Sequence, residues 1–435
     1  MVPPCININS PHGFNAKLPR MSRVRVNFSG SRIKDIAAKV QAQVRRSEIC
    51  SCIKPDMEIA VGCGSRGEAN NALIAAILVN ELKKSGARPF IFPAMGSHGA
   101  SSAQGQIKVL ASLGISEKTM GCLIKSTMET TCIGQMDDGI PIYLDKNACR
   151  ADGVVLINRI KPHTTFRGPI ESGIVKMMAI GMGKAKGADT LHAHGFGAFS
   201  KLLPKAAQFI MTKIPFLFGL ATVENAYHET AIVKAIPAKS LIPEEIKLQS
   251  RAKQMMGSLL FDKIDVLILD EIGKNISGAG FDPNIVGRNN RFVEWDGPLV
   301  KKIVLLDLSA KTEGNAVGMG LADVITMDLF NKIDFDTTYT NVVSSNLLDG
   351  GAIPMIANTE QQAISMAAMT VEKVPSKQCK IVKMKNTLEV SEILVSESLW
   401  PQVRSHPDMA FVGEPFEFKF DNQGRLLATE QGARA

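Results

Sequence analysis

Aromatic residues are scarce in this sequence, and a concentrated block of one charge is missing from it. Phenylalanine, tyrosine and tryptophan make up 6% of the 435 residues, and only 2 are tryptophan. Such a chain is poor in the side chains on which single-stranded nucleic acid stacks. The formal charge of +8, from 50 basic and 42 acidic residues, is small for this length. We therefore expect no nucleic-acid partner, and at most a modest attraction for anionic small molecules.

Long apolar runs and paired cysteine motifs are missing too. The longest apolar stretch, residues 206–221, is interrupted by Lys213 and Pro215, whereas a membrane-spanning helix needs roughly 20 apolar residues. Residues 1–28 contain no apolar segment of the kind found in signal peptides. The 8 cysteines form no Cys-x-x-Cys pair and show no disulfide framework. We expect reduced thiols, a cytoplasmic location and no membrane partner.

Alternating strand and helix patterns run along the chain, which exceeds the usual size of one domain. Residues 57–62 and 89–93 are typical of buried strands, and each precedes a glycine-containing loop and a helical pattern, over 68–85 and 103–113. This order predicts parallel βαβ units. We therefore predict an α/β fold: two α/β domains with parallel-type sheets and an active site in the cleft between them.

Three segments are predicted from these patterns. Residues 1–257 form an N-terminal α/β domain that carries the cofactor and the catalytic histidines, and residues 258–400 form a smaller C-terminal α/β domain. Residues 401–435 form an extension that packs back on the first domain. Further predicted elements are strands at 152–158, 264–270, 303–307 and 381–385, and helices at 243–256, 322–330, 360–368 and 390–399.

Four of the 7 histidines lie in loops punctuated by glycine or proline: His98, His163, His192 and His194. An imidazole titrates near neutrality and can accept or donate a proton. A single histidine is more often structural, but four in the loops of one domain favour a functional site. No cysteine or carboxylate stands at the spacing of a closed zinc site. A metal bound by one imidazole, with other donors from a cofactor, is compatible with this pattern.

The loop Gly62-Cys-Gly-Ser-Arg-Gly67 fits the Gly-x-Gly-x-x-Gly pattern between a strand and a helix. The second strand ends at Pro93 without the acidic residue that would hold a ribose, so a plain tight turn is the alternative. The guanidinium of Arg66 suits a carboxylate or phosphate ligand, or an ion pair with Glu68. Since ligands bind at the carboxyl ends of parallel strands, Arg66 and His98 are expected to share one crevice.

The order and spacing of five motifs resemble those of the lactate racemase family. They are Arg66 after a strand, Gly96-Ser-His98, Pro162-His163, Gly173-Ile-Val-Lys176 and His192. The resemblance extends over about residues 57–400 and indicates a divergent branch. It implies the fold of that family and its nickel-pincer nucleotide, a pyridinium mononucleotide that carries nickel between thioamide and thiocarboxylate groups.

The resemblance also implies a role for each matching residue. Lys176 would hold the cofactor through a thioamide, and His192 would ligate nickel, with His194 as the alternative ligand. His98 and His163 would be the acid/base pair, and Arg66 would contact the cofactor and orient the substrate carboxylate. The expected partners are a small hydroxy-acid substrate and the enzymes that make the cofactor.

Two positions depart from the family pattern. Cys63 stands where the family has an aspartate three residues before the arginine. The substrate lysine of the second domain has no clear counterpart, so Lys274 is the candidate, with Asp282 as a weaker alternative. We expect an isomerase: a racemase or epimerase of a 2-hydroxy acid, lactate-like or a sugar acid, acting by hydride removal and return. The alternatives are a metal-dependent hydrolase or lyase, and a non-catalytic nucleotide- or metal-binding protein.

Overall fold

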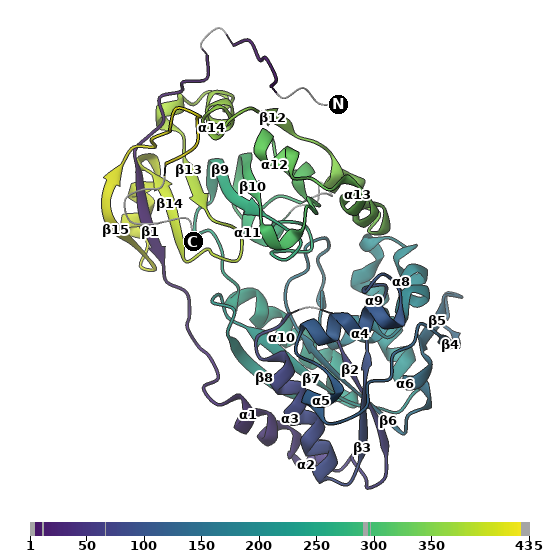
Figure 1. The fold of residues 1–435 in the computed structure, drawn as a ribbon. Helices are drawn as coiled ribbons and strands as arrows, with labels where there is room; N and C mark the ends of the chain where they lie inside the picture. Colours follow the sequence, from purple (N-terminus) through teal and green to yellow (C-terminus); the bar gives the residue numbers. More distant parts are fainter. Residues whose placement is uncertain (1–4, 11–12, 66, 290–294, 296, 428–435) are drawn as a thin grey trace. The chain divides into compact units, whose positions relative to one another are not determined.

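The computed structural model describes residues 5–10, 13–65, 67–289, 295 and 297–427 (Figure 1). The chain divides into two compact units. The N-terminal unit consists of Ser29–Met256, and the C-terminal unit consists of Met1–Phe28 together with Gly257–Ala435. Each unit combines a largely parallel sheet with helices, which confirms the predicted α/β class. The cleft between the domains stays a prediction.

A five-stranded sheet of order β3-β2-β6-β7-β8 forms the centre of the N-terminal unit. Strands β2 (Glu58–Cys63), β3 (Arg88–Pro93), β6 (Gly153–Arg159) and β7 (Phe216–Glu224) run parallel, and β8 (Thr230–Pro237) is antiparallel. The predicted strands at 57–62, 89–93 and 152–158 are thereby confirmed. Because four strands are parallel, their carboxyl ends lie at one edge of the sheet, which we call the carboxyl edge.

Both faces of this sheet are covered by apolar cores. Along β6, Val154 and Leu156 belong to one core, and Val155 and Ile157 to the other, because successive side chains of a strand point to opposite faces. The helices that cover the first face are α6 (Lys146–Arg150), α7 (Ile174–Lys176), α8 (Lys184–His192), α9 (Phe196–Met211) and α10 (Leu241–Met255). Those on the second are α1 (Ile36–Val44), α2 (Ser47–Cys50), α3 (Asn71–Lys84), α4 (Ala103–Ser112) and α5 (Glu117–Met120). A hairpin of β4 (Thr130–Gln135) and β5 (Pro141–Asp145) completes the unit.

The C-terminal unit contains an eight-stranded sheet of order β12-β11-β10-β9-β13-β14-β1-β15. Strands β12 (Met355–Ala357), β11 (Val324–Thr326), β10 (Leu299–Leu308), β9 (Lys263–Ile272) and β13 (Ile381–Met384) are parallel. The antiparallel part consists of β14 (Glu392–Ser396), β1 (Met21–Val26) and β15 (Met409–Phe416). The helices are α11 (Pro283–Val286), α12 (Met327–Asn331), α13 (Phe335–Ser344), α14 (Glu360–Met369) and α15 (Trp400–Ser405).

The predicted domain boundaries differ from the observed units at both chain ends. Residues 1–28 were assigned to the first domain, but β1 pairs with β14 and β15 in the C-terminal unit. The segment 401–435 was expected to pack on the first domain, whereas its strand β15 is an edge strand of the C-terminal sheet. Figure 1 shows the purple strand β1 among yellow strands from the other end of the chain. Pairing between such distant segments leaves no local pattern in the sequence.

Two predicted helices are wrong in whole or in part. Residues 390–399 contain β14 and a short 3-10 turn, and the alternating buried residues Ile393 and Val395 are those of a half-covered strand. Residues 322–330 contain the strand β11 before α12. The helices near 68–85, 103–113, 243–256 and 360–368 are confirmed as α3, α4, α10 and α14.

The apolar stretch at residues 206–221 is divided between the end of α9 and the start of β7. Among the residues that the structure describes, no helix has both the length and the apolar character needed to cross a membrane. All 8 cysteines are free thiols, in agreement with the sequence prediction.

We predict that β1 contributes strongly to the stability of the C-terminal unit. Val24 is fully buried between Ile393 and Phe411. Val24→Ala should therefore lower the free energy of unfolding by about 2 kcal/mol, through lost apolar burial and a residual cavity. Urea unfolding can be monitored by tryptophan fluorescence. This signal reports on the C-terminal unit, because Trp295 and Trp400 both belong to it.

The matched control is Val343→Ala, since Val343 belongs to the same unit but is 63% exposed. It should change the stability by less than about 0.5 kcal/mol. An equal effect of the two substitutions would contradict the role assigned to β1.

Candidate functional site

Three loops meet at the carboxyl edge of the N-terminal sheet. Ser65, in the loop after β2, hydrogen bonds to Nδ1 of His98, in the loop after β3. The backbone N–H of Gly96 donates to the carbonyl of Gly181 at 3.0 Å, which attaches the His98 loop to the segment after Lys176. The loops after β2 and β3 are thus in contact. Arg66 lies outside the described residues, so a crevice shared by Arg66 and His98 stays a prediction.

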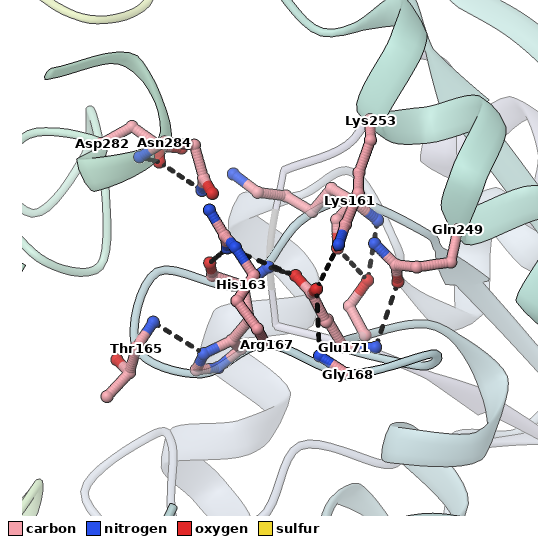
Figure 2. Close-up of polar contacts among 11 residues, drawn as sticks. Lys161, His163, Thr165, Arg167, Gly168, Glu171, Gln249, Lys253, Asp282 and Asn284 are labelled. Carbon is pink, nitrogen blue, oxygen red and sulfur yellow. Dashed lines mark hydrogen bonds and ion pairs between the residues drawn. The ribbon is translucent and has the colours of Figure 1, made fainter. Parts of the chain in front are cut away.

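A buried carboxylate holds the loop that carries His163. Glu171 is fully buried and accepts the backbone N–H of His163 at 2.9 Å and of Gly168 at 3.2 Å (Figure 2). It also pairs with Nζ of Lys253, from α10, at 2.6 Å. The backbone N–H of Thr165 donates to Nδ1 of His163 at 3.1 Å. In the neutral imidazole the proton therefore resides on Nε2.

A second buried carboxylate fixes the helical turn that ends in Lys176. Glu245, from α10, accepts the backbone N–H groups of Ile174 and Val175 at 3.0 and 3.1 Å. Burial raises the pKa of Glu245 to about 8, against the opposing effect of these two hydrogen bonds. Gly173 has φ 91°, and a Cβ there would come 2.7 Å from Oε1 of Glu245. Only glycine fits so close to this carboxylate.

Aromatic side chains connect Lys176 with two of the histidines. The ring of Phe166 lies 4.5 Å from the ring of His163 and 5.9 Å from Nζ of Lys176. The ring of His192 stacks on Phe199 at 5.3 Å, and Phe199 lies 5.5 Å from Phe166. We call Phe166, Phe196 and Phe199 the aromatic cluster. The structure therefore brings His163, Lys176 and His192 together around this cluster.

The imidazole of His192 is held in its neutral form. Burial lowers the pKa of His192, and the charge of Lys176 lowers it further, whereas Asp189 opposes the shift. A neutral imidazole offers the lone pair that a metal requires. The side chain of His194 is exposed in the turn that follows α8, so His192 is the better placed of the two predicted ligands. Which of them binds a metal stays a prediction.

The remaining predicted residues lie in the C-terminal unit or beside the site. Lys274 is in the loop after β9 and donates from Nζ to the carbonyl of Gly278 at 3.0 Å. Asp282 is buried and accepts the backbone N–H of Asn284 at 3.0 Å. Their part in the site stays a prediction. In the N-terminal unit, burial raises the pKa of the Cys63 thiol to about 12, so this side chain is neutral.

Four further residues at this edge were not predicted from the sequence: Ser65, Gln106, Glu171 and Glu245. Ser65 and Glu245 contact segments 33 and 70–71 residues away in the sequence. Glu171 and Gln106 bond to backbone groups only 3–10 residues away, but no recognised motif marks these contacts. Among the described residues, no group of three or more His, Cys, Asp or Glu side chains is arranged to hold a metal ion.

Comparisons with known proteins bear on the fold of this chain. Residues 18–198 match the family model of the lactate racemase N-terminal domain. The lactate racemase apoprotein from Thermoanaerobacterium thermosaccharolyticum has a similar structure, with a TM-score of 0.52 and 14% identity over 88% of this chain and 96% of that chain. This likeness shows the fold. Old Yellow Enzyme from Pichia sp. AKU4542 reaches a TM-score of only 0.14, at 8% identity over 79% of this chain and 78% of that chain. No curated protein matches the sequence.

We predict that Lys176→Met raises the pKa of His192, because the repulsion between two neighbouring cations is removed. The pKa can be measured by NMR on protein with ¹³C-labelled histidine, with the signal assigned through His192→Gln. The lowered pKa also means that the folded state binds this proton less readily than the unfolded chain. The contribution of His192 to stability is therefore lost as the pH falls through and below the ordinary histidine range.

Lys186→Met is the control, since Lys186 is an exposed lysine on α8, the helix that ends in His192. It should leave the pKa of His192 unchanged. An unchanged or lower pKa in Lys176→Met would show that Lys176 and His192 are not neighbours.

Proposed function

We propose, from the match of residues 18–198 to the lactate racemase N-terminal domain, that this protein is a racemase or epimerase of a small 2-hydroxy acid. The observation that supports the proposal most is the grouping of His163, Lys176 and His192 around the aromatic cluster. His98 lies at the same carboxyl edge of the sheet, bonded to Ser65. Two acid/base groups, an amine and a neutral imidazole are thus available in one unit.

The residues present fit the nickel-pincer nucleotide of this family. The amine of Lys176 would hold the nucleotide, and the neutral imidazole of His192 would supply a nitrogen ligand to nickel, a borderline metal that imidazole suits. The ring of Phe166 offers an apolar surface beside the lysine. When bound, the cofactor supplies the group that accepts a hydride and returns it. Enzymes that make this cofactor are the proposed protein partners.

The histidines would move the proton of the substrate hydroxyl. A racemase must treat both stereoisomers alike, so it needs one acid/base group for each face of the reacting carbon. His98 and His163 come from the loops after β3 and β6 and are held by separate partners, Ser65 and Glu171. Each can therefore keep its own orientation. Arg66 would bind the substrate carboxylate, and Lys274, or else Asp282, would bind the substrate from the C-terminal unit.

The substrate class is broader than lactate. Cys63 occupies the position of the family's aspartate, and its buried thiol, with a pKa of about 12, is neutral at physiological pH. The negative charge that the family's aspartate would supply at position 63 is therefore missing here. We infer that lactate-like acids and sugar acids are both suitable substrates.

The decisive experiment is mass spectrometry of the protein produced together with the cofactor-making enzymes. We predict an adduct on the peptide that contains Lys176 and about one nickel per chain, as a single cofactor site requires. Lys176→Arg should abolish the adduct. An unmodified Lys176 under these conditions, with zinc bound instead, would contradict the proposal and favour a metal-dependent hydrolase or lyase.

We further predict that His98→Ala and His163→Ala each lower turnover of the loaded protein by on the order of 10² or more, since each removes a general acid/base. Turnover is measured as racemisation of a panel of 2-hydroxy acids. The control is His228→Asn, because His228 is an exposed histidine in the turn between β7 and β8. Full activity of either alanine variant would exclude that histidine from the reaction. Ligand binding without any turnover in the unmodified protein would favour a binding protein.

A further inference from the structure

A lysine with no exposed surface lies beneath the His98 loop. Lys184, the first residue of α8, is 0% exposed. Its ammonium pairs with Oδ2 of Asp145 at 2.9 Å, donates to Oε1 of Gln106 at 3.0 Å, and donates to the carbonyl of Pro93 at the end of β3. A charge buried to this extent is costly unless such partners surround it.

The partner carboxylate is equally buried and has a second role. Asp145 is 0% exposed, and its Oδ1 caps α6 by accepting the backbone N–H groups of Asn147 at 2.8 Å and Ala148 at 3.1 Å. Buried ion pairs of this kind are weak evidence for a stabilising role, because apolar or neutral replacements often fold as well. Stability alone therefore does not explain why this ion pair is buried here. Its contact with Gln106 indicates that it orients the Gln106 side chain.

The ammonium determines which way the Gln106 amide points. An ammonium can only donate, so the Gln106 atom that faces Lys184 must be the amide oxygen. The Nε2 group then faces the opposite way and donates to the carbonyls of Gly96 at 2.8 Å and His98 at 3.2 Å. Gln106 is itself 0% exposed. Its amide therefore clamps two carbonyls of the His98 loop in an orientation that Lys184 selects.

The His98 loop needs such a clamp because its backbone is strained. Residues 99–101 have φ values of 69°, 52° and 50°, and two of them, Ala100 and Ser101, carry side chains that disfavour positive φ. A Cβ on Gly99 would come 2.6 Å from the backbone nitrogen of Gln106. Conformations of this kind persist only where surrounding contacts hold them.

We propose that Lys184 is a positioning residue for His98, acting through the side-chain amide of Gln106. The ammonium orients the amide, and the amide fixes the carbonyls on either side of Ser97. Because Lys184 opens the helix that ends in His192, the same contact ties the His98 loop to the segment that carries the candidate metal ligand. The catalytic consequence rests on the function proposed for His98; the effect on the loop does not.

The test compares two variants by hydrogen exchange and mass spectrometry on the protein without cofactor. Lys184→Met/Asp145→Asn removes both buried charges and keeps a capping side chain at position 145. Gln106→Met removes the clamp and leaves the ion pair in place. Both should raise exchange in the peptide that spans residues 95–102 by about 10-fold or more, while the melting temperature stays within about 3 °C of the parent.

Lys186→Met, on the exposed side of α8, is the control and should leave this peptide unchanged. In the loaded enzyme the two test variants should lower kcat by about 10-fold or more with KM within about 2-fold, because a displaced acid/base group affects the reaction and not substrate capture.

Parent-like exchange at residues 95–102 in either variant would overturn the proposal. Increased exchange across the whole unit with a large loss in melting temperature would also overturn it, since Lys184 would then act on general stability. The exchange measurement needs neither cofactor nor substrate. If the protein proves not to be a racemase, the proposed effect of Lys184 on the His98 loop can still be tested. The two proposals can therefore be refuted independently.

Discussion

The backbone polar groups of the loops at the carboxyl edge are the constraint on which the site depends. These loops are partly buried, so their N–H and C=O groups need partners that strands and helices would otherwise provide. Side chains supply them: Glu171, later in the same loop, for His163; Glu245, from α10, for the turn before Lys176; and Gln106, from α4, for the His98 loop. Each loop that carries a candidate side chain is therefore held by a hydrogen-bonding side chain outside the predicted set of site residues.

The same burial sets the charge state of the groups around the site. It raises the pKa of Glu245 to about 8 and that of Cys63 to about 12, and it lowers the pKa of His192. The common cause is that a charged form loses hydration on burial. Around Lys176 the result is a neutral imidazole beside a cation.

The local sequence pattern predicted strands β2, β3 and β6 and helices α3, α4 and α10 of the N-terminal unit, because βαβ units bury whole strands and one stripe of each helix. It failed at residues 390–399, where Ile393 and Val395 lie in a strand. The five buried positions of this short segment fit either the helical or the strand period. The sequence also placed residues 1–28 with their neighbours in the chain, whereas β1 completes a sheet with β14 and β15.

By itself, the sequence determined the α/β class, the order of the loops that carry His98, His163, Lys176 and His192, and the family resemblance, because these features depend on residues close together in the chain. The tertiary structure alone decided which groups meet. It joined Ser65 to His98, brought Lys176 near His192 around the aromatic cluster, and buried Lys184 beneath the His98 loop. The physical reason is that burial and partner choice depend on contacts between segments tens to hundreds of residues apart, which no local spacing encodes.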